Sequence, residues 1–296
     1  MRPREGRVGL AVSGGPDSMA LLLLAHAHLG DRVEVATVDH GLRPEAAEEC
    51  ALVARVCAER GIRCQILPVN VEGGNVQDRA RAARYAALGQ WAVERKLAAI
   101  ATAHHADDQA ETLLMRLNRG SGLAGLAGIR SSTLIDGCPV PVIRPLLGFR
   151  KSELQDIVES AGMPSVEDPS NRDVSYERVR IRRHLEQADW IDPLALARSA
   201  SYLEEVECAL DALARDLWNA RALVEAEQVT LPLASSAETN ARLVARAIAV
   251  LGGTASHGQV AAFLKSGQRR GNIAGVLVDR RDDSYICRPE PPRRRG

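Results

Sequence analysis

Short apolar segments alternate with longer amphipathic segments through the first half of the chain. The apolar segments predict strands near residues 8–12, 33–38, 64–69 and 98–102. The amphipathic segments predict helices near residues 17–29, 45–60, 76–96 and 107–118. This alternation is typical of an α/β fold in which a parallel sheet carries helices on both faces. Ligands of such sheets bind beyond the carboxyl ends of the strands, so a functional site is expected at that edge.

The chain is organised differently after residue 118. Residues 119–149 are rich in Gly and Pro and predict a loop with a strand pair near 130–143, followed by helices near 151–161 and 176–187. Asp192-Pro193 is the expected boundary between a first domain, residues 1–192, and a second domain, residues 193–296. We expect the second domain to be small and mostly α, with helices near 194–227, 238–251 and 257–265 and a C-terminal hairpin of strands near 273–279 and 284–288.

Bulk composition sets limits on function. The 296 residues include 46% hydrophobic and 26% charged residues, which is ordinary for a globular protein with room for two domains. Aromatic residues amount to only 3%, which argues against a platform that stacks nucleic-acid bases. The formal net charge is zero, so any contact with nucleic acid has to come from local basic patches.

The six cysteines are scattered and form no C-x-x-C pair. Their spacing argues against a zinc site, an iron–sulfur site and a disulfide framework, and it fits a reducing cytoplasm. We find no secretory signal and no apolar run of membrane length, so a cytoplasmic protein without a membrane partner is expected. Only three of the 38 basic residues are lysines; arginine suits phosphate contacts, but we favour a G+C-rich genome as the cause of this bias.

The first predicted strand runs directly into a glycine turn and an apolar helix. The turn reads Ser13-Gly14-Gly15-Pro16-Asp17-Ser18. A strand, a glycine turn and a helix start present backbone N–H groups to phosphate, and Pro16 fits a first helical turn. Asp17 is placed to help hold a magnesium ion. The sequence G-x-x-x-x-G-K-[ST] is absent, which excludes the usual ATPase loop with its lysine. The alternative is an ordinary Gly-rich connection.

A second polar cluster follows the second predicted strand. It reads Val38-Asp39-His40-Gly41-Leu42-Arg43-Pro44. Asp39 and His40 at a strand end are well placed to bind a ligand or to orient an adenosine. A plain strand-to-helix connection with a cap explains the same residues equally well.

The third cluster is the most distinctive and covers residues 103–112, A-H-H-A-D-D-Q-A-E-T. If a helix starts near Asp107, then Asp107, Asp108 and Glu111 share one face. Together with His104 they can bind magnesium, act as a general base or recognise an ammonium group. A structural account is also open, because aspartates stabilise a helix N-terminus.

The loop at 13–18 resembles the pyrophosphate-binding loop of the PP-loop, or N-type, ATP pyrophosphatases. The longer stretches together resemble the tRNA(Ile)-lysidine synthetases. They are S-G-G-P-D-S at 13–18, V-D-H-G-L-R at 38–43, T-A-H-H-A-D-D-Q-A-E-T at 102–112, R-L-N-R-G-S-G-L-A-G-L-A-G-I at 116–129, R-P-L-L at 144–147 and E-D-P-S-N-R-D-V-S-Y-E-R at 167–178. The resemblance is strong over residues 8–185. Over residues 195–296 only the size and the position of the domain are similar, and this domain is expected to contact tRNA.

This resemblance implies a reaction. With ATP and Mg²⁺, the enzyme adenylates the C2 carbonyl oxygen of the wobble cytidine in an isoleucine tRNA with a CAU anticodon. Free lysine then attacks C2 through its side-chain amine and expels AMP, which leaves lysidine. The amine must lose a proton before it attacks, so a carboxylate or an imidazole is needed close by.

The resemblance also implies roles for individual residues. ATP binding falls to Ser13, Gly14, Gly15, Pro16, Asp17, Ser18, Asp39, His40, Thr102 and Ala103. Catalysis falls to Asp17, Asp39, His104, Asp107, Asp108 and Glu111, with Asp17 and Asp108 as magnesium ligands. Contact with tRNA falls to Arg178, Arg180 and Arg182, although a solvated face explains these arginines too. The family pattern after Tyr176 reads Arg-Asn, whereas Val179 follows Arg178 here, which puts fine tRNA discrimination in doubt.

Other functions compete with this reading. A PP-loop tRNA thiolase also adenylates a base, but it needs a persulfide-bearing cysteine or a cluster held by paired cysteines. Residues 102–129 are less consistent with an ammonia-dependent synthetase that adenylates a small molecule. A catalytically dead RNA-binding module is disfavoured by the intact acidic residues. The apolar helices near 194–217 suit either a second copy in a homodimer or the protein's own core.

Overall fold

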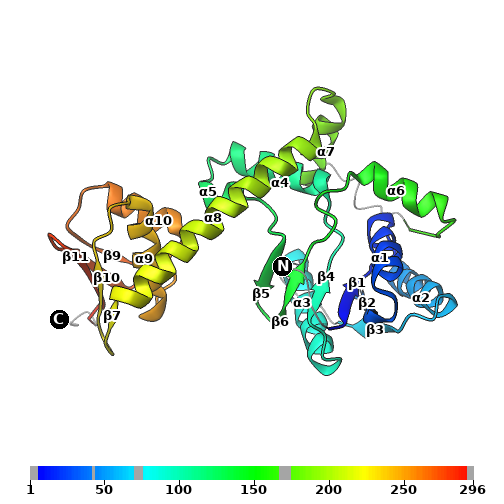
Figure 1. Ribbon diagram of the computed structural model, residues 1–296, viewed down its shortest axis with the longest axis horizontal. Coiled ribbons are helices and arrows are strands. Elements are labelled where there is room, and N and C mark those ends of the chain that lie inside the picture. The colour runs from blue at the N-terminus through cyan, green and yellow to red at the C-terminus, as the bar shows by residue number, and fades with distance from the viewer. Residues whose placement is uncertain (1–5, 42–43, 70–75, 167–174, 292–296) are drawn as a thin grey trace. The chain divides into compact units, whose positions relative to one another are not determined.

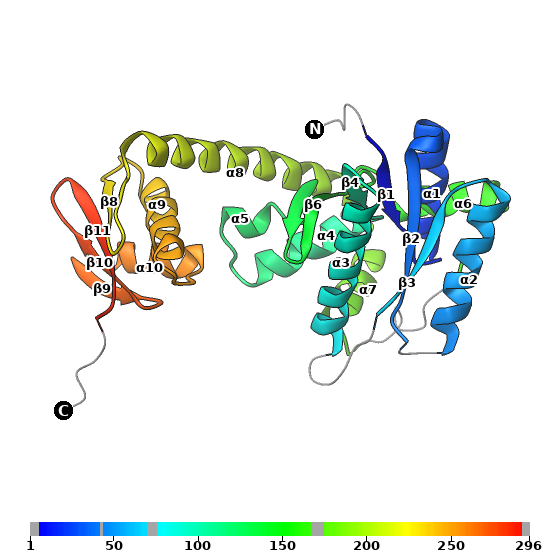
Figure 2. The same cartoon turned by 90° about the horizontal axis from the view of Figure 1, so that it is seen from below.

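The computed structural model describes residues 6–41, 44–69, 76–166 and 175–291. The chain divides into two compact units, Met1–Tyr202 and Leu203–Gly296. Each unit has its own sheet and its own core (Figures 1 and 2). The candidate site lies in the first unit.

The first unit is built on a six-stranded sheet. Its strands are β1 (Val8–Ala11), β2 (Val33–Asp39), β3 (Cys64–Pro68), β4 (Ala99–Ala101), β5 (Ser132–Ile135) and β6 (Cys138–Ile143). They lie in the order β3-β2-β1-β4-β6-β5; all neighbours are parallel except the edge pair β5 and β6. The predicted parallel sheet is confirmed, and the predicted strand pair is its antiparallel edge.

Helices pack on both faces of this sheet, as the sequence predicts. Helices α1 (Pro16–Leu29), α2 (Pro44–Glu59) and α6 (Lys151–Ser160) share a core with one face, and α3 (Val76–Glu94) shares a core with the other. The unit also contains α4 (Ala106–Asn118), α5 (Leu123–Leu126), α7 (Glu177–Gln187) and a short 3₁₀ turn η1 (Gly30–Arg32). Successive residues of a strand point to opposite faces, and β2 illustrates this. Val33 and Val35 join the core under α1, α2 and α6, whereas Ala36 joins the core under α3.

The boundary between the units lies inside a helix. Helix α8 (Pro193–Arg221) begins at the residue where the second domain is expected to begin. The compact units divide further along the same helix, between Tyr202 and Leu203. The helix ends at Arg221, six residues before the end predicted for it.

The second unit contains more strand than the sequence predicts. Helices α9 (Ala237–Val250) and α10 (His257–Lys265) pack against an antiparallel sheet of β7 (Leu223–Val224), β8 (Val229–Pro232), β9 (Arg270–Ile273), β10 (Val276–Arg280) and β11 (Ser284–Pro289). The predicted hairpin is the pair β10 and β11, in which Asp279 lies opposite Ile286. The other three strands are too short for an alternating pattern to be visible. Among the described residues, no helix has both the length and the apolar content needed to cross a membrane.

Candidate active site

Segments that follow three different strands of the first unit line one cavity of about 800 Å³. They are the loop between β1 and α1, the end of β2, and the segment between β4 and α4. Helices α2, α3, α6 and α7 also contribute to the walls, through residues that include Glu49, Cys50, Arg84, Leu88, Lys151, Gln155, Arg178, Arg182 and Glu186. The structure therefore brings together most of the residues that the sequence motifs single out.

The loop between β1 and α1 is held in shape by its own serines. Ser18 Oγ donates to the Gly15 carbonyl at 2.9 Å and accepts from the Ser13 N–H at 3.1 Å. Gly14 adopts φ +88°, a conformation that glycine takes without strain. Helix α1 begins at Pro16, and the first N–H groups of a helix have no carbonyl partner within it. These groups and the two hydroxyls form a cradle suited to phosphate oxygens.

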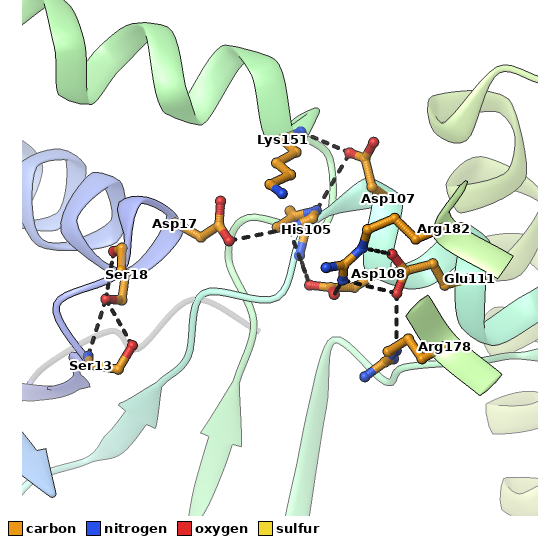
Figure 3. A network of polar contacts seen from close by, with 11 residues as sticks. Ser13, Asp17, Ser18, His105, Asp107, Asp108, Glu111, Lys151, Arg178 and Arg182 are labelled. Carbon is orange, nitrogen blue, oxygen red and sulfur yellow. Dashed lines mark hydrogen bonds and ion pairs between the residues drawn. The ribbon is translucent and has the colours of Figure 1, made fainter. Parts of the chain in front are cut away.

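His105 lies at the centre of the carboxylates (Figure 3). Its side chain is 3% exposed; Nε2 lies 3.5 Å from Asp17 Oδ2 and 3.4 Å from Asp108 Oδ2, and Nδ1 lies 3.5 Å from Asp107 Oδ2. Burial alone lowers the pKa of His105, but its contacts with Asp107 and Asp17 and the charge of Asp108 prevail and raise it to about 10. His105 is therefore an imidazolium that links the loop to helix α4.

The sequence motif contains two adjacent histidines, and our prediction selected only His104. The Nδ1 atom of His104 lies 3.0 Å from the hydroxyl of Thr102, and both side chains line the cavity. Burial lowers the pKa of His104 to about 4, and the charge of Asp108 opposes this only in part. The two imidazoles therefore differ in charge near pH 7, with His104 neutral and His105 protonated.

Asp107 does not line the cavity. One of its oxygens, Oδ2, accepts a hydrogen bond of 2.7 Å from the backbone N–H of Lys151, at the first residue of α6. Burial raises the pKa of Asp107, but its bonds to His105 and to the Lys151 N–H prevail and lower it. Asp107 is thus a carboxylate that fixes the start of α6 beside the site.

Glu111 is buried against helix α7 and is 1% exposed. Its Oε1 lies 2.6 Å from Arg182 Nε and its Oε2 lies 3.0 Å from Arg178 Nε. Burial raises the pKa of Glu111, an effect that Arg182 opposes. Arg178 and Arg182 lie four residues apart and share the face of α7 that lines the cavity, whereas Arg180 Nη1 donates to the Ser175 carbonyl. The three arginines that the sequence analysis grouped therefore have two different surroundings.

The remaining predicted residues also fall into two groups, those that line the cavity and those that do not. Thr102, Ala103 and His40 line the cavity, and burial together with the charge of Arg84 lowers the pKa of His40. Asp39 is not among the cavity-lining residues; its Oδ1 accepts from the Gly41 N–H at 2.9 Å. Of the quoted motif residues, 42–43 and 167–174 lie outside the part of the chain that the structure describes.

The residues present fit a magnesium ion bound mainly through phosphate. Asp17 Oδ1 is buried and has no hydrogen-bond partner among the described residues, although Asp17 lines the cavity. Within the same residues, no group of three or more His, Cys, Asp or Glu side chains is arranged to hold a metal ion. Magnesium is usually held by one or two carboxylates together with substrate phosphates and water, which matches Asp17 with Asp108 nearby.

Gln109 binds the segment after α5 to helix α4, which carries the acidic residues. Its side chain is 2% exposed, donates to the Ile129 carbonyl at 3.0 Å and accepts from the Ile129 N–H at 2.6 Å. Gly128 has φ +64°, and a Cβ atom on it would lie 2.4 Å from Gln109 Oε1. The contact between Gln109 and Ile129 therefore requires glycine at this position.

Replacement of Gly128 with alanine is expected to lower the free energy of unfolding by about 3 kcal/mol, because a left-handed conformation and a displaced Gln109 both cost energy. Gly120 provides a matched control, since it has φ +63° with open space around it. Gly120→Ala is expected to cost only the conformational part, about 1–2 kcal/mol. Urea unfolding measures both; equal losses would contradict this requirement.

Comparison with known proteins agrees with this geometry. Residues 2–188 match a family model described as a PP-loop domain. A tRNA(Ile)-lysidine synthase from Novosphingobium aromaticivorans is 45% identical over 98% of this chain and 91% of its own length. One from Zymomonas mobilis is 45% identical over 90% of this chain and 83% of its own. A solved U34-tRNA thiolase from Methanococcus maripaludis shares the fold, with a TM-score of 0.56, 19% identity, and coverage of 68% of this chain and 72% of that one.

The fold and the phosphate loop thus define a PP-loop enzyme that uses ATP. The similarity to the two synthases extends over both units. The chain belongs to the tRNA(Ile)-lysidine synthase family.

Proposed function

We propose that this protein joins free lysine to C2 of the wobble cytidine of an isoleucine tRNA with a CAU anticodon, in the cytoplasm. The observation that carries the proposal is a single cavity in which a phosphate-binding loop faces His104, His105 and Asp108. Family membership supports the choice of tRNA, because the relatives carry that enzyme name.

The proposed reaction has two steps. In the first, O2 of the cytidine attacks the α-phosphorus of ATP, the bond to the bridging oxygen of the β-phosphate breaks, and pyrophosphate leaves. In the second, the side-chain amine of lysine attacks C2, the C2–O2 bond breaks, and AMP leaves with that oxygen. A ring carbonyl oxygen is a poor leaving group, so its conversion to an AMP ester makes the second step feasible.

The second step requires an amine that has lost its proton. His104 is the better base of the two histidines, because burial keeps its imidazole neutral near pH 7. Asp108 lines the same cavity and is suited to attract the ammonium group of lysine before deprotonation. Glu111, which is buried and paired, acts as a positioning residue for Arg178 and Arg182.

Magnesium and tRNA complete the proposal. Asp17 and Asp108 would hold Mg²⁺, which supplies neutralisation of the phosphate charge when it is bound. Arg178 and Arg182 reach the cavity and suit phosphate oxygens there. Arg180 and the second unit are assigned to contacts with the tRNA backbone outside the cavity.

A thiolase reaction is less well supported. Among the described residues, Cys50 is the cysteine that lines the cavity. It is 3% exposed, it accepts a hydrogen bond from the Thr37 hydroxyl, and burial raises the pKa of its thiol. A buried thiol with a raised pKa is a poor nucleophile and a poor carrier of sulfur.

Incorporation of radiolabelled lysine into unmodified isoleucine tRNA, with ATP and Mg²⁺, tests the proposed function. We expect label that depends on ATP and that falls at least about 100-fold in Asp17→Ala, because this variant loses a carboxylate that would hold the Mg²⁺ ion beside the reacting phosphates. Asp31→Ala, an exposed aspartate of η1, serves as a matched control with unchanged activity. Absence of label with the wild-type protein, while ATP is cleaved on another substrate, would contradict the choice of lysine and tRNA.

A further inference from the structure

Within the part of the chain that the structure describes, the ammonium group of one cavity-lining lysine has no polar partner. Lys151, the first residue of α6, is half-buried and lines the cavity. Among the described residues, no hydrogen bond or ion pair involves its ammonium group; its only polar contact is made by its backbone N–H. Arg178 and Arg182 on another wall are both paired with Glu111. A half-buried ammonium without a counter-ion is costly unless a ligand supplies one.

A chain of contacts places Lys151 opposite the phosphate loop. The Lys151 N–H donates to Asp107, whose carboxylate lies 3.5 Å from His105 Nδ1. The other ring nitrogen of His105 lies 3.5 Å from Asp17, at the start of α1. Figure 3 shows the Lys151 side chain directed toward Asp17 and His105. The start of α6 and the phosphate loop are therefore held on either side of the same space.

The phosphate chain of ATP needs more positive charge than the loop supplies. Residues 13–18 contain no lysine or arginine, and Asp17 adds a negative charge. When the bond between the α- and β-phosphates breaks, the electron pair remains on the bridging oxygen, so the departing pyrophosphate gains charge. Charged groups that are fixed in advance beside such an oxygen lower the barrier to its departure.

We propose that Lys151 binds the β- and γ-phosphates of ATP and neutralises the pyrophosphate as it leaves. The ammonium keeps its proton throughout and acts by charge alone. ATPases with the G-x-x-x-x-G-K-[ST] loop carry a phosphate-binding lysine within that loop. Here the lysine comes instead from helix α6, which starts 133 residues after Ser18. This inference rests on the proposed function only in that ATP is cleaved between its α- and β-phosphates.

Equilibrium binding of two nucleotides tests the role of Lys151. We would titrate α,β-methylene-ATP, which cannot be cleaved, and AMP, each with Mg²⁺, into wild type, Lys151→Met and Lys151→Arg. In Lys151→Met we expect the affinity for α,β-methylene-ATP to fall about tenfold or more and that for AMP to change less than about twofold, because AMP lacks the contacted phosphates. Lys151→Arg is expected to restore most of the affinity.

The controls separate this role from folding and from the identity of the substrate. Methionine retains the backbone N–H that Asp107 accepts, so urea unfolding should be close to that of wild type. Lys265→Met, at the exposed end of α10, should bind both nucleotides as wild type does. Unchanged affinity for α,β-methylene-ATP, or equal losses for both nucleotides, would overturn the proposal. Nucleotide binding needs neither tRNA nor lysine. The binding experiment therefore tests the role of Lys151 even if the protein does not incorporate lysine into tRNA.

Discussion

His105→Gln is expected to reduce lysine incorporation by at least about 100-fold. The buried imidazolium separates three carboxylates, and glutamine keeps a hydrogen-bond donor without the charge. Asp17, Asp107 and Asp108 would then repel one another, and the loop and α6 would lose their common anchor. His28→Gln, an exposed position on α1, is the matched control. Activity of His105→Gln close to that of wild type would contradict this central role.

The same imidazolium gives the wild-type protein a characteristic dependence on pH. The pKa of His105 is raised to about 10 in the folded state, compared with about 6.5 in an unfolded chain. A group with a raised pKa contributes stability that is complete below the unfolded value and is lost as the pH rises through the folded value. We therefore expect the urea midpoint of wild type to fall between pH 7 and 10 more steeply than that of His105→Gln. Parallel slopes would show that His105 is not charged in the folded protein.

The parallel sheet and the edge that carries the site could be predicted because both depend on patterns within short segments. Short apolar runs identify the strands, and the carboxyl ends of parallel strands meet at one edge whatever the order of the strands. Three strands of the second unit, β7, β8 and β9, escaped prediction for the same reason. Strand β7 has two residues and β8 and β9 have four each, which is too short for a strand pattern to be recognised in the sequence.

The choice between His104 and His105 could not be made from sequence. The backbone at His105 is extended, with φ −126° and ψ −177°, and consecutive side chains of an extended segment point in opposite directions. One imidazole therefore faces Thr102 while its neighbour enters the carboxylate cluster. Which of them does so depends on where α4 begins, and helix boundaries are the least predictable feature of a sequence.

The partner of Glu111 was also beyond the reach of local patterns. The spacing of Asp108 and Glu111 correctly places them near each other, but it gives no information on α7, which begins 66 residues after Glu111. Arg178 and Arg182 reach Glu111 only because α4 and α7 pack together in the folded chain. Glu111, which the sequence analysis grouped with the catalytic residues, is paired with two arginines in the folded protein.

The pairing of Glu111 with Arg182 predicts a large loss of stability when Arg182 is removed. Arg182→Met is expected to lower the free energy of unfolding by about 3 kcal/mol near pH 7, because Glu111 would remain buried with only Arg178 as a partner. Addition of Glu111→Gln to this variant should restore part of the lost stability, because the buried carboxylate that lacks its partner is then replaced by a neutral amide. Urea unfolding of wild type, both single variants and the double variant gives the coupling between the two residues.

The loss in Arg182→Met should also shrink in acid. Burial already raises the pKa of Glu111, and Arg182 is the main group that opposes this effect. Without Arg182 the pKa of the folded carboxyl rises further above its unfolded value, so the variant is favoured below the unfolded value and loses stability as the pH rises through the folded one. The difference in unfolding free energy between wild type and Arg182→Met should therefore be smaller at pH 5 than at pH 7.5. If the difference is the same at both values, then Arg182 contributes through packing and not by neutralising Glu111.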